Sequence, residues 1–304
     1  MGGTTGASKS SKAALGLAFG SKKSKKAIQA YQANAIAPSK ALAEDKIASA
    51  VIESMPVQPA TQKEDMQAEV DAARPIPRPN LAATRPEDVY TVESLVGGAD
   101  VLARIPVKDW MDELAKPDGN VQVRSKFVSQ KIATLCEKGD VKMVRVLRYT
   151  YMLIMWWKCL RPGKGPRSGK TTPRLERSPQ PQTNEAVLAE FPKHVLADME
   201  KRFSEGGTLS RWHDDRVIAH ILALTLHIDG WESDTCGIQF DLKKDHKEVA
   251  RYFAELGAKA TAMMKREYER RGISRVEASM RRVARLSCPV SLPKLRTGGG
   301  GKRR

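Results

Sequence analysis

DHKEVARYFAELGAKATAM (Asp245–Met263) is the stretch of sequence that decides the predicted fold. Asp245 and Glu248 fit a capping box, in which the Asp245 carboxylate accepts a first-turn N–H and Glu248 reaches back to the helix start. The apolar residues that follow share one helical face: Val249, Phe253 and Leu256. Gly257 can end this helix, and the alternating residues 258–263 predict a strand directly after it.

A second alternating stretch, RRVARLSC (Arg281–Cys288), predicts the partner strand, with Arg281 and Arg285 facing away from Leu286. The residues between the two strands, 264–279, are rich in Arg and Lys and predict a charged loop. With two helices expected upstream, the order becomes helix, helix, basic helix, strand, loop, strand. That order is typical of a winged helix, in which the third helix can enter a DNA groove and the loop, or wing, can reach the backbone.

The candidate DNA-binding residues follow from this arrangement. At about 100° per residue, Lys247 and Arg251 fall on the face of the basic helix opposite its apolar residues. The predicted phosphate contacts are Lys243, Lys244, Lys247 and Arg251 on the helix, and Arg266, Arg270, Arg271, Arg275, Arg281 and Arg285 on the wing. Winged helices also bind proteins through the same faces, so protein contact is the alternative at this helix.

Upstream periodicity predicts further helices with apolar faces, over 107–115, 125–137, 141–160, 191–203 and 214–229. Asp214 and Asp215 suit the start of the last of these, where a capping role is favoured over catalysis. The predicted fold is mainly α with small β wings. It comprises a flexible, partly helical, Pro-rich linker (1–84), a first winged-helix domain (85–160), a basic loop (161–184), a second winged-helix domain (185–296) and a basic tail (297–304).

The charge of the chain is uneven along its length. The 304 residues include 52 Lys and Arg against 35 Asp and Glu, a net charge of +17. Residues 161–178 carry +5 and residues 235–304 carry +11, whereas residues 179–234 carry −5. A localised excess of this kind indicates a polyanionic partner, most often nucleic acid.

Several patterns that suggest other chemistry fail on their spacing. The loop GKGPRSGKTT (163–172) resembles a Walker A motif, but the required first glycine position is Lys164 and no strand precedes the loop. His213, His220 and His227 recur every seven residues, about 10.5 Å apart along a helix, which is too far for a shared metal. The four cysteines form no CxxC pair, and no apolar run reaches the length of a membrane span. We therefore expect no catalytic residues, metal, cofactor or membrane association.

The order of several segments resembles a known family. These segments are RPEDVYTVESLV (85–96), FVSQKIATL (127–135), VRVLRYTYMLIMWW (144–157), FPKHVLADMEKRF (191–203), SRWHDDRVIAHILALTLHIDGWESD (210–234), DLKKDHKEVARYFAELGAK (241–259) and VARLSCPVSLPK (283–294). Over residues 85–296 they are similar to the tandem winged-helix region of the forty-nine-kilodalton-type subunit of RNA polymerase I, known in animals as a polymerase-associated factor of fifty-three kilodaltons.

The resemblance implies a non-catalytic, nuclear and nucleolar subunit that binds double-stranded DNA and the polymerase I core and supports initiation and elongation of ribosomal RNA transcription. Members of the family also form a heterodimer through an N-terminal TFIIF-like barrel. Only about eighteen residues precede the basic segment that begins at Phe19, so we expect that this barrel is missing or that the sequence is truncated.

Two other functions remain open at this level. A general winged-helix transcription or chromatin factor would bind specific sequences and would not copurify with polymerase. A nucleotide-hydrolysing enzyme would use the loop 163–172, which its spacing opposes.

Overall fold

The computed structural model describes residues 71, 73–162, 170–171 and 184–293. Residues 75–293 form one compact unit. Just before it, Asp71 and Arg74 form an ion pair, with 2.8 Å between Arg74 Nε and Asp71 Oδ1. The predicted tail 297–304 lies outside the described residues, as does most of the predicted linker 1–84.

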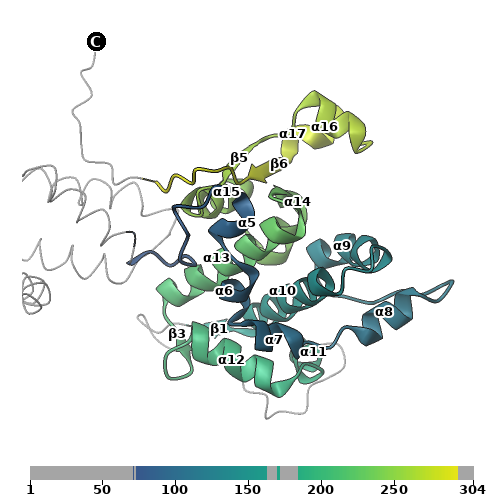
Figure 1. The fold of residues 1–304 in the computed structure, drawn as a ribbon, viewed down its shortest axis with the longest axis vertical. Helices are drawn as coiled ribbons and strands as arrows, with labels where there is room; N and C mark the ends of the chain where they lie inside the picture. The colour runs from purple at the N-terminus through teal and green to yellow at the C-terminus, as the bar shows by residue number, and fades with distance from the viewer. Residues whose placement is uncertain (1–70, 72, 163–169, 172–183, 294–304) are drawn as a thin grey trace, which may run out of the picture. The chain divides into compact units, whose positions relative to one another are not determined.

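Two long helices form the centre of the unit 75–293. They are α10 (Val141–Cys159) and α13 (Arg211–Ile228), which pack against each other (Figure 1). Most of their side chains are buried, because both sequences are apolar on nearly all sides. The side chain of Asp140 caps α10 by accepting the N–H of Met143.

The start of α13 differs from the prediction. Ser210 caps this helix by accepting the N–H of His213, so the helix begins at residue 211 and not at 214. Because the helix starts earlier, Asp214 and Asp215 turn toward neighbouring helices and do not cap it. Asp214 lies in the first turn of α13, where its negative charge suits the helix start as predicted, but the N-cap is Ser210 and the Asp214 side chain accepts a hydrogen bond from Trp157 Nε1 at 2.7 Å.

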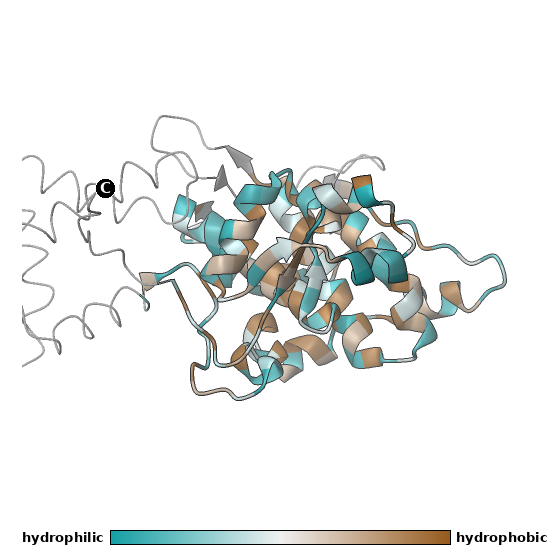
Figure 2. Cartoon of the chain, turned by 90° about the horizontal axis from the view of Figure 1, so that it is seen from above, coloured by the Kyte–Doolittle hydropathy of each residue, from teal (hydrophilic) through white to brown (hydrophobic). Residues whose placement is uncertain are grey.

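Shorter helices surround the central pair, and Figure 2 shows hydrophobic and hydrophilic residues side by side along the helices of this unit. They are α5 (Pro86–Val89), α6 (Val92–Val96), α7 (Ala99–Ala103), α8 (Lys108–Leu114), α9 (Lys126–Glu137), α11 (Asn184–Ala189) and α12 (Lys193–Phe203). The helices predicted over 107–115, 125–137 and 191–203 are confirmed, with ends that differ by at most two residues. Ser125 caps α9 by accepting the N–H of Val128.

Two small antiparallel sheets complete the secondary structure. The first pairs β1 (Arg161–Pro162), β2 (Lys170–Thr171) and β3 (Thr208–Leu209) in that order, so parts of the predicted basic loop are strands. The second has the order β4–β6–β5, from β4 (Glu232–Asp234), β5 (Lys259–Ala262) and β6 (Arg282–Arg285). Ala260 of β5 lies opposite Ala284 of β6. The strand pair predicted after the basic helix is confirmed, and β4 adds a third strand.

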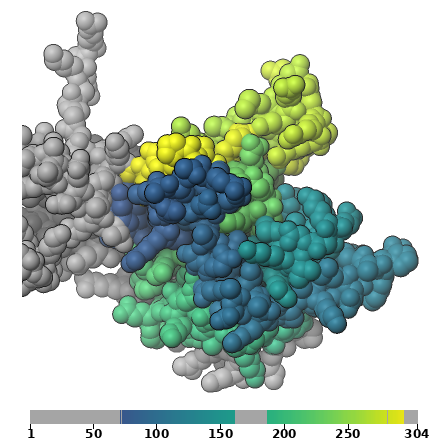
Figure 3. All heavy atoms as spheres, viewed as in Figure 1, coloured from purple at the N-terminus to yellow at the C-terminus, as the bar shows by residue number. Residues whose placement is uncertain are grey.

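The segment between β5 and β6 is helical, which corrects the predicted loop. It forms α16 (Lys265–Arg270) and α17 (Arg275–Met280), and we call residues 264–281 the arm. Figure 3 shows the arm as a protrusion from the rest of its unit. A small apolar cluster holds it together, made of Met263, Ala278 and Val283 with Tyr268 and Ile273 packed against them. This local core is what allows a strongly charged segment to fold as two short helices.

The described residues therefore form a mainly α structure with small antiparallel sheets, as predicted. The remaining helices are α14 (Thr235–Leu242) and α15 (His246–Glu255), which lie against each other and lead into β5. None of the helices described here is long and apolar enough to cross a membrane.

Candidate nucleic-acid interface

The turn between α14 and α15 carries the first predicted cations. Lys243 ends α14 in a left-handed conformation with φ of 51°. Two residues later, Asp245 caps α15 and Glu248 completes the capping box, with 2.7 Å between the Glu248 nitrogen and Asp245 Oδ1. The backbone N–H of Glu248 lowers the pKa of the Asp245 carboxyl. The predicted capping box is confirmed, and it fixes the point at which the basic helix begins.

One face of α15 is anchored in the protein. Val249 and Phe253 are fully buried, and the Tyr252 hydroxyl donates to Asp215 on α13 at 2.5 Å. Burial raises the pKa of Tyr252, and the nearby Asp215 carboxylate raises it further. This hydrogen bond sets the rotation of α15 about its axis, so that Lys247 and Arg251 lie on the exposed side.

Lys244 is placed differently from its neighbours. Its ammonium lies 5.4 Å from the centre of the Tyr252 ring, a cation–π contact, and the side chain is half-buried. Lys243 and Lys247 are exposed and make no ion pair within the described residues. The two exposed lysines therefore have their charges available to a partner.

The arm presents three of the predicted arginines outward. Arg266, Arg270 and Arg275 are exposed, and among the described residues none of them makes an ion pair. Their neighbour Lys265 lies 3.7 Å from Glu269, one turn further along α16. The outer side of the arm is thus basic, although it is helical and not the predicted loop.

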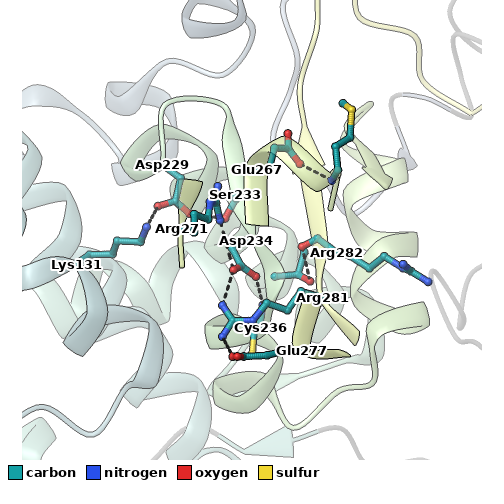
Figure 4. A network of polar contacts seen from close by, with 12 residues as sticks. Lys131, Asp229, Ser233, Asp234, Cys236, Glu267, Arg271, Glu277, Arg281 and Arg282 are labelled. Carbon is teal, nitrogen blue, oxygen red and sulfur yellow. Dashed lines mark hydrogen bonds and ion pairs between the residues drawn. The ribbon is translucent and has the colours of Figure 1, made fainter. Parts of the chain in front are cut away.

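Three other predicted arginines are held by internal ion pairs, shown in part in Figure 4. Arg281 and Arg271 reach the carboxylate of Asp234 at 2.9 and 3.5 Å. Arg281 also pairs with Glu277 on α17. Burial opposes the charge of Arg281, but the hydrogen bonds to these two carboxylates outweigh it and raise its pKa.

Arg285 makes the corresponding contacts at the other end of β6. It pairs with Glu267 on α16 and lies 3.5 Å from Glu232 on β4. The N–H of Met264 lowers the pKa of Glu267, and the Arg285 guanidinium lowers it as well. Arg271, Arg281 and Arg285 therefore fasten the arm to the sheet, which makes them less available to a ligand.

Sequence reasoning missed two residues that lie beside this surface. Asp241 on α14 is fully buried and binds the start of α9, where its carboxylate accepts hydrogen bonds from Ser125 Oγ at 2.7 Å and Phe127 N at 2.9 Å. Phe240, its neighbour, is 69% exposed. A lone acidic residue and a lone aromatic within a short apolar helix carry no periodic signal.

The three histidines singled out by their spacing lie at different depths along α13. His213 is near Ser210, the buried His220 donates from Nδ1 to the Arg216 carbonyl at 2.8 Å, and His227 donates to the Tyr90 carbonyl. Burial lowers the pKa of His220 to about 3. No group of three or more potential metal ligands occurs among the described residues.

Only the end of the Walker-like loop belongs to the described structure. Lys170 and Thr171 form strand β2, which pairs on both sides with β1 and β3. The rest of the loop, 163–169, lies outside the described residues.

Comparison with known proteins identifies the family. A model described as A49-like RNA polymerase I associated factor matches residues 2–293. The chain belongs to this family. The match also includes the residues before 85, which the segments quoted above do not cover.

Two curated relatives agree with this A49-like assignment. DNA-directed RNA polymerase I subunit RPA49 of Saccharomyces cerevisiae is 26% identical over 302 residues, covering 96% of this chain and 70% of the relative. DNA-directed RNA polymerase I subunit rpa49 of Schizosaccharomyces pombe is 27% identical over 304 residues, covering 94% and 66%.

Proposed function

We propose that this A49-like chain is a non-catalytic subunit of RNA polymerase I that holds double-stranded DNA and supports initiation and elongation of ribosomal RNA transcription in the nucleus and nucleolus. The family match over residues 2–293 and the names of both relatives support the polymerase role. The DNA-binding role rests on the basic surface of α15.

The observation that carries the proposal is the outward face of an anchored helix. The capping box fixes where α15 begins, and the Tyr252–Asp215 hydrogen bond fixes its rotation. Lys247 and Arg251 therefore present positive charge from a rigid element, which reduces the ordering cost of binding. Lysine and arginine in this arrangement contact phosphates, which gives affinity without sequence readout.

The order α13, α14, α15, β5, arm, β6 supports a winged helix, with the arm in the place of the wing. In this proposal α15 is the recognition helix and the outward arginines of the arm reach the adjacent backbone. The residues proposed to contact phosphate are Lys243, Lys244, Lys247, Arg251, Arg266, Arg270 and Arg275. Arg271, Arg281 and Arg285 act indirectly, by holding the arm in place.

The double variant Lys247→Ala/Arg251→Ala tests this function. We expect weaker binding to several unrelated duplexes alike, and a log–log salt dependence less steep by about 1.8, because each lost phosphate contact removes about 0.9. Fluorescence anisotropy titrations at several salt concentrations measure both quantities.

The matched control is Lys108→Ala/Lys116→Ala, at the first residue of α8 and just after its end, which removes the same charge from exposed positions, with α8 distant from α15 (Figure 1). Its affinity should stay close to that of the unsubstituted chain. Equal affinities for the α15 variant and the unsubstituted chain at low salt would rule out α15 as the contact surface.

A further inference from the structure

Phe240 is an aromatic side chain that the core does not use. It is 69% exposed, whereas Ile238 and Leu242 on the same helix are buried. Among the described residues of α9 and α14, no other large apolar side chain is exposed. Leaving such a ring in water forgoes the stabilisation that burial gives, so an isolated exposed phenylalanine invites a functional explanation.

The ring stands in a positive environment. The ammonium of Lys126, at the start of α9, lies 5.2 Å from the centre of the Phe240 ring. Lys243, three residues after Phe240, is exposed and makes no ion pair within the described part of the chain. The adjacent carboxylate, Asp241, is buried and already paired with Lys158 at 2.9 Å, so it does not cancel this charge at the surface.

The backbone beneath the ring is rigid. Asp241 accepts hydrogen bonds from the backbone nitrogens of Lys126 and Phe127, at 3.0 and 2.9 Å, which ties α14 to the first turn of α9. The helices also approach closely at Gly237, where an added Cβ would lie 3.1 Å from Phe127 Cα. Phe240 and Lys126 are thus held beside each other before any partner arrives.

These features together fit a nucleic-acid strand better than a protein. Bases stack on aromatic rings and their phosphates pair with nearby cations, which is the combination that single-strand binding surfaces use. An apolar protein pocket closing over the ring would have to desolvate the Lys126 ammonium beside it. Protein interfaces also favour a core of several apolar side chains, and here one ring stands alone.

We propose that Phe240, Lys126 and Lys243 form a platform for an unpaired nucleobase, which stacks on the Phe240 ring while the two ammonium groups contact phosphates of the same strand. The inference rests on the proposed function, because it assumes that the chain binds nucleic acid. It adds a preference for a locally opened duplex over a fully paired one, through a surface that shares Lys243 with the proposed duplex contacts and extends from it to Phe240 and Lys126.

The test compares the full chain on a DNA duplex with a central unpaired bubble and on the matching paired duplex. Phe240→Ala should weaken binding to the bubble about tenfold and leave binding to the paired duplex unchanged, because stacking of one base is lost. Phe240→Trp should keep the bubble affinity. A 2-aminopurine placed in the bubble should be quenched by the unsubstituted chain and not by Phe240→Ala. Single-stranded DNA and single-stranded RNA with the bubble sequence are assayed in parallel, and their relative affinities show whether the platform prefers a DNA or an RNA base.

Phe240→Leu is the deciding control, since it keeps an apolar side chain without a ring. It should behave like Phe240→Ala. An unchanged bubble preference in Phe240→Leu would overturn the inference, and so would a bubble preference that no Phe240 variant alters. Failure of the unsubstituted chain to bind any duplex would instead refute the proposed function, so the two failures can be told apart.

Discussion

Asp241 shows how much one buried carboxylate can organise. Its side chain accepts hydrogen bonds from Ser125 Oγ, from the backbone nitrogens of Lys126 and Phe127, and from Lys158 Nζ. The two nitrogens belong to the first turn of α9, whose positive end favours a negative charge. Lys158 comes from the end of α10, so this one residue links three helices.

Removing this carboxylate should therefore be costly. We expect Asp241→Ala to lower the free energy of unfolding by about 3–5 kcal/mol, because it leaves the Lys158 ammonium and two helix N–H groups without their buried acceptor. Urea or guanidinium denaturation measures the change.

Two further variants qualify this prediction. Asp112→Ala, on the exposed side of α8, should change stability by less than about 0.5 kcal/mol. Combining Asp241→Asn with Lys158→Met should cost less than the sum of the single changes, because the pair is removed together. Strict additivity would show that the Asp241–Lys158 ion pair contributes nothing.

At this scale the sequence was informative only where chemistry is local. The Asp245–Glu248 capping box involves residues three apart and was predictable. The side-chain partners of Asp241 lie more than eighty residues away in the sequence, so no local pattern could predict their contacts with it. The same holds for Asp215, whose hydrogen bond to Tyr252 joins two helices and explains why it does not cap its own.

The arm shows how an element can depend on ion pairs. Its two helices have six residues each, too short to be stable alone. They are held by the small apolar cluster around Val283 and by the pairs that Arg281 and Arg285 make across β6. Because arginines under the arm neutralise its acidic residues, the remaining arginines can face outward.

Two substitutions on α16 separate these contributions. Glu267→Gln should loosen the arm, because Glu267 pairs with Arg285 and also accepts the N–H of Met264. Trypsin should then cut within 265–275 about fivefold faster for each 1 kcal/mol of local stability lost. Glu269→Gln removes an equal charge from the same helix, where Lys265 is its only ion-pair partner among the described residues, and this variant should be cut at the original rate. Equal rates in both variants would contradict the fastening role.

The arm also marks the limit of prediction for elements. The alternation of 281–288 revealed β6, but the charged residues 264–279 have no long apolar face, so a loop was the natural expectation. What makes them helical is the packing of Tyr268 and Ile273 onto the sheet, a tertiary contact. Strand β4 was missed for a related reason, since three residues are too few for a pattern to show.

For the molecule as a whole, the assignment to polymerase I makes a direct prediction. Affinity purification of the tagged full chain from nuclear extract should recover the large polymerase I subunits. The Lys247→Ala/Arg251→Ala variant should recover them equally well, since it is designed to affect DNA contact. A chain that binds DNA but never recovers the polymerase would favour a general winged-helix factor instead.

The excess charge of +17 also takes on a more limited meaning at this scale. Composition alone located the excess in the last quarter of the chain and in the loop 161–178. Composition does not show which arginines form ion pairs with internal carboxylates, because those pairs depend on contacts between strands and helices that are distant in sequence. Arg266 and Arg271 look alike in the sequence, yet Arg271 pairs with Asp234 on another element.

The Asp241 contacts finally bear on how the chain can be cut for experiments. Every donor to that carboxylate lies before residue 160, while Asp241 itself lies in the predicted second domain. The Tyr90 hydroxyl likewise binds the Leu256 carbonyl, 3.0 Å away, at the end of α15. In a recombinant fragment starting near residue 185, the Asp241 carboxylate would lose all of these donors and α15 would lose its contact with Tyr90. A loss of binding by such a fragment would therefore report damage to its structure, and not the absence of a binding site.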